Sequence, residues 1–198
     1  VVTGALAFEE LAWGDLAATL AIMTPNLLAV PVMLCGTEAQ RETYLPPCCQ
    51  EAPPNVTAAL IEPVVQFTPY QLKTTAVRDG DAYVLNGAKT FVPLADEAET
   101  ILIYANEDGH TQAFLVPAGT PGMKVDKRDK MMGVKALSTN FVTLADCRVP
   151  AENRLGGAAG IDFSLILNHS RVALSAAAVG VARAGFEYAR DYAKQRVQ

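Results

Sequence analysis

The spacing of apolar and polar residues divides the chain into three zones. Residues 1 to about 50 carry apolar side chains at helical spacing, and the stretch from Ile161 to the end does so again. Between about residues 56 and 150, short apolar or β-branched runs alternate with turn residues. This order predicts an α+β protein. Its middle zone is expected to form an antiparallel β-sandwich or barrel, because no helical pattern separates its strands.

The first zone is predicted to hold several short helices. Its charge-free segment, residues 16–37, is interrupted at Pro25, so we expect two packed helices and no membrane span. Thr37 and Gln40 have the spacing of a capping box, in which each side chain bonds the other residue's backbone N–H. The helix that begins there is expected to stop at Leu45, because two prolines follow it. Trp13 and Phe8 are interpreted as core residues.

The middle zone is predicted to contain strands at Thr74–Val77, Ala82–Leu85, Thr100–Tyr104, Ala113–Val116 and Phe141–Leu144. Turns are expected at Asp79-Gly80, Asn86-Gly87, Asp108-Gly109 and Pro121-Gly122. Beyond the second of these turns, Lys89 is expected to face solvent by alternation from Tyr83. Pro93 is expected to end this strand, because proline cannot donate to a ladder of strand hydrogen bonds.

The last zone, residues 161–198, is rich in Ala and apolar around much of its circumference. It therefore predicts a buried helix in a bundle, with Leu174, Ala178 and Val181 on one face. Gly180 and Gly185 would allow a neighbouring helix to approach closely. We expect the chain to be the central portion of a longer protein.

Composition excludes several classes of function. Hydrophobic residues make up 51% of the 198 and charged residues only 19%, which excludes a disordered chain. The net charge is −5 and the 16 basic residues are scattered, which excludes a nucleic-acid footprint. The four cysteines form no C-x-x-C pair, and neither of the two histidines has ligand spacing, so we expect reduced thiols and no metal site.

Short motifs follow one another in an order that points to one protein family. They are CGTEAQRETYLPP, AALIEP, DGDAYVLNGAKTFV, AFLVP, KMMGVKALSTNFVTLADCRVP, NRLGG and SRVAL…YAKQRVQ. In this order they resemble the acyl-CoA dehydrogenase family of flavoproteins over nearly the whole chain. The resemblance implies the end of an N-terminal helical domain over residues 1–56, a middle β domain over 57–157, and the start of a C-terminal helical domain over 158–198.

The resemblance also implies FAD, held between the β domain and the C-terminal helices. The residues that match the family's cofactor contacts are Leu60, Ile61, Phe91, Val92, Pro93, Arg196 and Gln198. Leu60 and Ile61 match the backbone at the polar edge of the flavin ring, and Phe91 matches the aromatic position beside the ring. Arg196 and Gln198 match positions that reach the flavin pyrophosphate of a neighbouring subunit, which implies a homo- or hetero-oligomer. A guanidinium suits that contact because it offers two donors to phosphate oxygens.

Leu167, Ser170 and Arg171 match the acyl-binding end of the family's substrate site. Arg171 matches a buried arginine, whose partner is expected to be a helix C-terminus or Glu62. A subset of the family carries the catalytic glutamate directly before this arginine, but here that residue is Ser170, which cannot act as a base by itself. We therefore predict no catalytic residue in this chain and expect the segment alone to be inactive.

Two departures from the family pattern bear on the cofactor. Val64–Thr68 replaces a run of small residues that ends in Gly-Ser-Asp, and Phe67 stands where the serine hydroxyl would be. Pro93 replaces a threonine whose hydroxyl addresses the flavin. Losing one such hydrogen bond costs on the order of 1 kcal/mol, which is too little by itself to abolish binding. The hypothesis is that the intact protein retains FAD, with an altered or empty flavin pocket as the alternative.

The function implied by the resemblance is oxidation of an acyl-CoA to the trans-2-enoyl-CoA. The electrons would pass to an electron-transferring flavoprotein, in the cytoplasm of a bacterium or in the mitochondrial matrix. One alternative is a flavin-less structural partner in a hetero-oligomer, and another is a flavin monooxygenase of the same fold. A binding module without chemistry is disfavoured by the order of the motifs.

Overall fold

The computed structural model describes residues 2–197 and contains two compact units. The larger, called the sheet unit here, comprises Met23–Met131 and Ser138–Phe163. The smaller, called the helix unit, comprises Val1–Ile22, Met132–Leu137 and Ser164–Gln198. The predicted division into domains at residues 56 and 157 stays a prediction.

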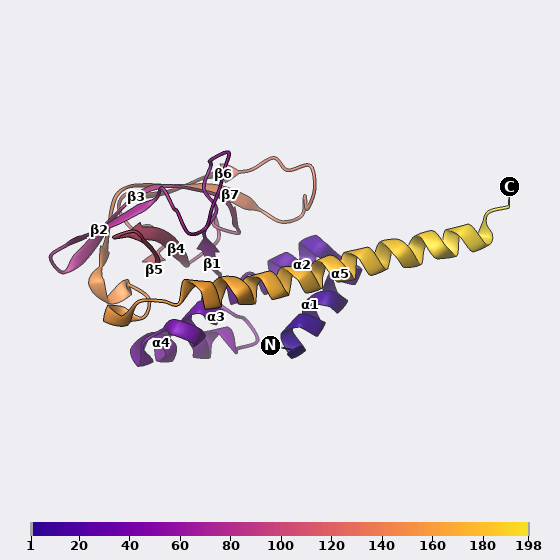
Figure 1. The fold of residues 1–198 in the computed structure, drawn as a ribbon, viewed down its shortest axis with the longest axis horizontal. Helices are drawn as coiled ribbons and strands as arrows, with labels where there is room; N and C mark the ends of the chain where they lie inside the picture. Colours follow the sequence, from indigo (N-terminus) through magenta and orange to yellow (C-terminus); the bar gives the residue numbers. More distant parts are fainter. Residues whose placement is uncertain (1, 198) are drawn as a thin grey trace. The chain divides into compact units, whose positions relative to one another are not determined.

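A seven-stranded mixed sheet forms the sheet unit, in the order β1-β4-β2-β3-β7-β6, with β5 also paired to β4 (Figure 1). The strands are β1 (Val56–Ala59), β2 (Thr75–Asp79), β3 (Ala82–Pro93), β4 (Thr100–Glu107), β5 (His110–Pro117), β6 (Met123–Arg128) and β7 (Thr139–Pro150). β1 and β2 run parallel to β4, and the other pairs are antiparallel. The α+β class is confirmed, but the sequence predicted antiparallel pairing only. The parallel pairing of β1 with β4 carries no clear sequence signal, because the β2–β3 hairpin makes the crossover that a helix usually makes.

The turns that join the strands differ from the predictions at one position. The turns predicted at Asp79-Gly80 and Asp108-Gly109 are confirmed by the hairpins they close. The turn predicted at Asn86-Gly87 is wrong, because β3 continues through it with a bulge between Leu85 and Gly87. Gly87 has φ of 148°, and a Cβ there would lie 2.6 Å from Thr74 Oγ1. The glycine therefore serves the close approach of two segments.

Two helices belong to the sheet unit, α3 (Asn26–Cys35) and α4 (Glu38–Cys48). The capping box at the start of α4 is confirmed: Thr37 Oγ1 accepts from the Gln40 N–H at 3.2 Å, and Gln40 Oε1 accepts from the Thr37 N–H at 3.0 Å. The predicted stop at Leu45 is wrong, because α4 continues to Cys48. Pro46 and Pro47 lie in its final turn, where their missing N–H groups leave only the Glu42 and Thr43 carbonyls without the usual intrahelical partner. The predicted break at Pro25 is confirmed by the gap before α3.

The core of the sheet unit is formed by side chains from β3, β4, β5 and β7. Its fully buried members include Leu85, Ile101, Ile103, Phe114, Val116 and Val149. Tyr83 on β3 contacts Phe114 on β5, with ring centroids 5.0 Å apart. This packing fixes the body of β3 and therefore the place where the strand ends. The short helices η1 (Ala151–Asn153) and η2 (Gly157–Ala159) follow β7.

The helix unit contains α1 (Val2–Gly14), α2 (Leu16–Met23, whose last residue belongs to the sheet unit) and α5 (Phe163–Gln195, which likewise begins in the sheet unit). α1 and α5 meet at Gly180, where an added Cβ would lie 2.1 Å from the Glu9 carbonyl oxygen. Arg183 on α5 pairs with both Glu9 and Glu10. Trp13 was predicted to be a core residue, which is wrong: it is exposed, and its indole N–H donates to Glu187 at 2.8 Å.

The predicted burial of α5 is wrong for this chain, because its apolar residues Leu174, Val179, Val181 and Phe186 are exposed. Over the described residues, α5 is long and apolar enough to cross a membrane by length and composition, as is the pair α2 and α3 if it is taken as one broken span. A helix covered by other protein passes the same test. The four cysteines are free. Residues 2–197 contain no cluster of side chains that could hold a metal ion.

Candidate cofactor site

The end of β3 turns one aromatic side chain outward. The pairing of β3 with β7 shifts register between Lys89 and Val92, so Thr90 and Phe91 form a bulge. A bulge breaks the alternation of side chains along a strand. Val92 is therefore buried, whereas Phe91 is 47% exposed and has φ of 53°. A large residue rarely adopts a positive φ unless the surrounding structure imposes it.

The segment that follows β1 lies beside this bulge. The Thr90 N–H donates to the Ile61 carbonyl oxygen at 2.9 Å, which places the Ile61 backbone beside Thr90, the residue before Phe91. The Ile61 side chain is 41% exposed, and Leu60 is half-buried. We call Leu60, Ile61 and Phe91 together the strand-end platform. Leu60 and Ile61 thus lie beside the end of β3, near a residue about 30 positions later in the sequence, and all three residues are predicted to contact the cofactor.

A buried ion pair lies behind the platform. The Lys89 ammonium donates to Glu62 Oε1 at 2.9 Å and to the Leu60 carbonyl oxygen at 3.2 Å. The predicted exposure of Lys89 is wrong, because the residue has 0% exposure. The prediction treated the face of Tyr83 as outward, but Tyr83 and Leu85 are both buried. The spacing of residues in the sequence did not indicate that Glu62 is the partner of Lys89. Its carboxylate offsets the free-energy cost of burying the ammonium group.

Burial and partners act on the two charges in opposite directions. Burial lowers the pKa of Lys89 from 10.5 to about 8, although the Glu62 carboxylate beside it acts to raise this pKa. Burial also acts to raise the pKa of Glu62, but hydrogen bonds from Thr74, Lys73 and Lys89 outweigh it and leave this pKa lowered. Glu62 accepts the Lys73 and Thr74 N–H groups at 2.7 and 2.8 Å. The pair is therefore ionised at neutral pH and connects the exit of β1, the entry of β2 and the body of β3.

Pro93 ends β3 opposite Thr139 on β7, as the sequence predicts. The Leu94 N–H then donates to the Ser138 carbonyl oxygen at 2.9 Å. Thr139 is buried, and within residues 2–197 its hydroxyl oxygen has no hydrogen-bond partner. Buried polar atoms normally have partners. Pro93 has no hydroxyl, but Thr139, its neighbour on β7, has a hydroxyl without a partner among the described residues.

The platform fits one end of a flavin better than the other. Ile61 and Phe91 present exposed apolar surface, which suits the face of a flat aromatic ring. Among the described residues no acceptor is recorded for the Ile61 N–H, which suits a polar ring edge. The platform offers no cationic group to the pyrophosphate end of the cofactor, because Val64–Thr68 contains no basic residue and Val65 is fully exposed. Phosphate contacts would have to come from elsewhere.

The predicted substrate residues all lie on α5. Leu167 is buried, and the Ser170 hydroxyl donates back to the Ile166 carbonyl oxygen at 3.3 Å. Arg171 was expected to be buried and paired with a helix C-terminus or Glu62, and this is wrong: it is exposed, and Glu62 pairs with Lys89. An exposed guanidinium needs no buried partner, because water solvates its charge.

Arg196 follows the end of α5, and its guanidinium lies 5.6 Å from the centroid of the Tyr192 ring. Gln198 lies outside the described residues. A helix rises about 1.5 Å per residue, so Arg171 and the last residue of α5 are roughly 36 Å apart. Arg171 and Arg196 therefore cannot contact one ligand within a single copy of this straight helix. That these α5 residues and the strand-end platform line one slot stays a prediction.

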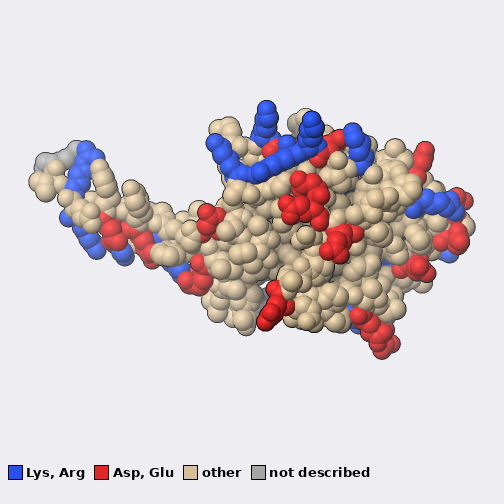
Figure 2. All heavy atoms as spheres, turned by 180° about the vertical axis from the view of Figure 1, so that it is seen from behind, with Lys and Arg blue, Asp and Glu red and all other residues tan. Residues whose placement is uncertain are grey.

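Charged side chains of both signs lie along the C-terminal part of α5 (Figure 2). They include Glu187, Arg190, Asp191, Lys194 and Arg196. Asp191 pairs with Arg190 at 2.9 Å and with Lys194 at 3.6 Å. Arg196 forms no ion pair among the described residues, so its charge is available to an anionic group.

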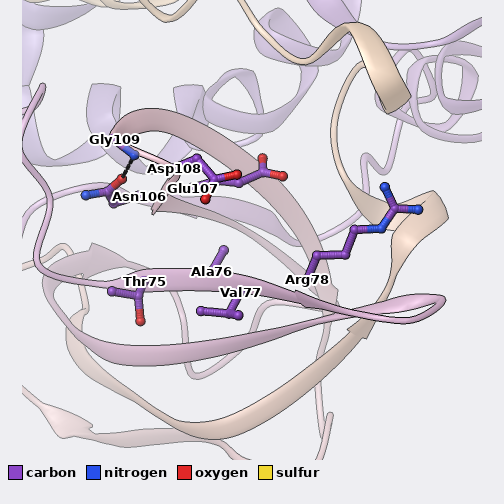
Figure 3. A pocket seen from close by; sticks show the side chains of 8 residues that line it. All are labelled: Thr75, Ala76, Val77, Arg78, Asn106, Glu107, Asp108 and Gly109. Atoms are coloured by element: carbon purple, nitrogen blue, oxygen red, sulfur yellow. Dashed lines mark hydrogen bonds between the residues drawn. The ribbon is translucent and has the colours of Figure 1, made fainter.

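A shallow cleft of about 430 Å³ opens elsewhere in the sheet unit (Figure 3). It forms where β2 and β4, which pair only at Thr75 and Asn106, diverge. The Gly109 N–H donates to the Asn106 side chain at 2.8 Å across its rim, and Arg78 extends away from the other lining residues. None of the residues predicted to hold cofactor or substrate lines this cleft.

The curled mixed sheet and the helices that precede and follow it in the chain define an α+β protein. The chain belongs to the acyl-CoA dehydrogenase family. A profile described as "Acyl-CoA dehydrogenase, middle domain" matches residues 57–147, and one described as "Acyl-CoA dehydrogenase, N-terminal domain" matches residues 1–52. This family consists of flavin-dependent oxidoreductases that act in fatty acid metabolism.

Individual relatives support the same assignment. Caffeyl-CoA reductase-Etf complex subunit CarC of Acetobacterium woodii is 34% identical over 98% of this chain and 53% of its own length. The structure of butyryl-CoA dehydrogenase from Megasphaera elsdenii has a TM-score of 0.83 and 33% identity, over 98% of this chain and 53% of that one. A glutaryl-CoA dehydrogenase from Mycobacterium smegmatis, in complex with FADH2, has a TM-score of 0.85 and 28% identity, over 98% and 50%. The chain thus spans about half the length of the relatives it matches.

Proposed function

We propose that the protein containing this chain is an FAD-dependent acyl-CoA dehydrogenase. The observation that carries the proposal is the strand-end platform, in which Leu60, Ile61 and Phe91 meet at the positions that match the family's ring contacts. Family membership and the FADH2 complex of a relative support the choice of cofactor. The reaction is oxidation of an acyl-CoA to the trans-2-enoyl-CoA.

The residues of this chain bind and orient in that reaction. Bound flavin supplies a two-electron acceptor for hydride from the substrate's β-carbon. Phe91 and Ile61 would cover the face of the ring and exclude water from it, and the Ile61 N–H would donate to its polar edge. Arg196 binds a phosphate of the cofactor held by a neighbouring subunit, in keeping with its distance from Arg171 along α5.

The base that removes the α-proton lies outside this chain. Ser170 does not replace it, because an aliphatic hydroxyl needs a base of its own to accept a proton at neutral pH. Its hydroxyl hydrogen is moreover engaged by the Ile166 carbonyl oxygen within α5. His169, the next residue, likewise bonds its own helix, with Nδ1 3.0 Å from the Leu165 carbonyl oxygen.

The electron acceptor in this proposal is an electron-transferring flavoprotein, and the assembly is an oligomer. The name of the Acetobacterium woodii relative places that protein in a complex with such a flavoprotein. The proposed location is the cytoplasm of a bacterium or the mitochondrial matrix.

The test uses the intact protein, purified with FAD and mixed without oxygen with acyl-CoAs of increasing chain length. The proposal predicts that one class of acyl-CoA bleaches the flavin absorbance and yields one enoyl-CoA per flavin. Bound flavin that no acyl-CoA reduces, but that activates oxygen once reduced, would instead identify a monooxygenase.

A second candidate is a structural partner subunit that has lost flavin. It is favoured by Pro93, which ends β3 without a hydroxyl, and by the bulky segment Val64–Thr68. An intact protein that is colourless, does not bind added FAD and co-purifies with a second, flavin-containing subunit would support this candidate over the first.

A further inference from the structure

The Lys89–Glu62 ion pair lies between β1, β2 and β3 and also contacts the strand-end platform. Lys89 Nζ donates both to the Glu62 carboxylate and to the Leu60 carbonyl oxygen, at 2.9 and 3.2 Å. The second contact joins a fully buried ammonium group to the peptide bond between Leu60 and Ile61. That peptide bond belongs to the strand-end platform.

The orientation of this peptide bond follows from its neighbours. The Leu60 carbonyl points to Lys89, and the Ile61 carbonyl points to the Thr90 N–H at 2.9 Å. Both carbonyls of the segment are thus engaged by β3. The N–H of the Leu60–Ile61 peptide bond, which is that of Ile61, has no acceptor recorded among residues 2–197. The segment consequently offers a ligand a donor and not an acceptor.

A charged donor on a carbonyl changes the other end of the same amide. Hydrogen bonds polarise one another along a chain of donors and acceptors, more so away from water, and bonds to ionised groups are stronger than neutral ones. An ammonium on the Leu60 oxygen therefore makes the Ile61 N–H a stronger donor. The Glu62 carboxylate opposes part of this effect, because it lies 2.9 Å from the same ammonium group, but the 3.2 Å bond from Lys89 Nζ to the Leu60 oxygen acts on the amide directly.

We propose that Lys89 is a positioning residue that acts through the Leu60–Ile61 peptide bond to strengthen the Ile61 N–H as a donor to bound flavin. The inference rests on the proposed function, since it requires flavin on the strand-end platform. Reduction increases the negative charge on the polar part of a flavin ring, so a stronger donor favours the reduced over the oxidised form. Lys89 thereby raises the reduction potential of the flavin without touching it.

A merely structural ion pair would behave differently. Breaking a buried pair destabilises a fold wherever it lies. A change in reduction potential requires that the charge act on the flavin. Arg154 and Glu107 offer a matched control in the same unit, with a 2.7 Å ion pair whose side chains are 13% and 15% exposed. Neither belongs to the strand-end platform.

The experiment measures the FAD dissociation constant and the two-electron reduction potential of the intact protein. The variants are K89M/E62Q, which removes both buried charges together, and R154M/E107Q as the control. Lys89→Gln, which replaces the ammonium group with a neutral amide, serves if the double variant does not fold. We expect K89M/E62Q or K89Q to weaken FAD binding and to shift the equilibrium at least tenfold toward oxidised flavin, which is about 30 mV more negative. The control is expected to retain the parent potential.

Three results would overturn the inference, and they are distinguishable. If the parent binds flavin and the Lys89 variants keep its potential, the pair is structural only and the proposed function still stands. If the parent binds no FAD at any concentration tested, the proposed function fails and this inference fails with it. An equal shift in the R154M/E107Q control also contradicts a specific effect of Lys89.

Discussion

Burial makes Lys89 a weaker base in the folded protein than in the unfolded chain. In the unfolded chain its pKa is that of an ordinary lysine, 10.5, and in the folded protein burial lowers it to about 8. Between these two values the unfolded state binds more protons than the native state. By linkage, the contribution of Lys89 to the free energy of unfolding therefore rises as the pH increases from about 8 to 10.5.

This sign can be measured by denaturant unfolding of the intact protein and of K89M/E62Q from pH 7 to 10. The free energy of unfolding of the parent is expected to increase relative to that of the variant as the pH rises above about 8. The slope against pH is expected to correspond to at most one proton. Burial also raises the pKa of Tyr104, and it raises the pKa of Cys147 to about 11. The raised pKa values of these two groups make the free energy of unfolding fall as the pH rises, and they do so equally in the parent and in the variant. Parallel stability curves would show that Lys89 is not titrating in this range.

At the scale of elements, one glutamine joins α4 to the segment after β7. Gln40 is buried, and its side chain accepts the N–H groups of Thr37 and Gly156 and donates to the carbonyls of Glu152 and Arg154, all at 2.9–3.0 Å. Every polar position of this amide is used. The capping box therefore does two things: it starts a helix and fixes a distant loop.

Gln40→Met should lower the free energy of unfolding by roughly 3 kcal/mol, because buried N–H and C=O groups lose their partner. The control is Gln50→Met, an exposed residue with one 3.4 Å hydrogen bond, which should change stability by less than about 0.5 kcal/mol. Thermal melting of the intact protein measures both. Equal melting temperatures for the two variants would mean that the Gln40 network contributes nothing.

Two glycines of α5 should respond oppositely to the same substitution. A Cβ on Gly180 would lie 2.1 Å from the Glu9 carbonyl oxygen of α1, whereas a Cβ on Gly185 would meet no atom within 4 Å. Gly180→Ala should destabilise the contact between α1 and α5 by about 1–3 kcal/mol. Gly185→Ala should stabilise the helix by up to about 1 kcal/mol through helix propensity. Melting temperatures that move in the same direction would contradict this packing.

Local patterns predicted the elements well where the signal is contained in a few adjacent residues. The capping box of α4, the hairpin turns and the end of β3 at Pro93 all belong to this kind. The predicted stop of α4 at Leu45 is a local signal that failed, and other predictions failed where a partner distant in sequence decides the outcome. Gly87 accommodates Thr74 and makes no turn, and Lys89 is buried because Glu62 lies opposite it.

At the scale of the whole molecule, the order of zones and motifs was enough to predict the α+β class and the family. The parallel pairing of β1 with β4 was not predicted, because it depends on which strands meet in space. For the site, the sequence predicted Leu60, Ile61 and Phe91; the structure places Ile61 beside the end of β3, and their contact with a cofactor stays a prediction. The sequence missed the ion pair behind them, whose only sequence signal is a lysine and a glutamate in neighbouring motifs.

The central claim is that the strand-end platform holds the ring of FAD. FAD titration of the intact protein, followed by flavin absorbance and fluorescence, tests it most directly in the parent, in Ile61→Glu and in Val77→Glu. Val77 is an exposed apolar residue of β2 outside the platform, so it controls for adding a surface charge. We expect one FAD per chain in the parent and in Val77→Glu, with at least tenfold weaker binding in Ile61→Glu. A parent that binds no FAD, or an Ile61→Glu variant that binds it as tightly as the parent, would show that the platform does not hold the ring.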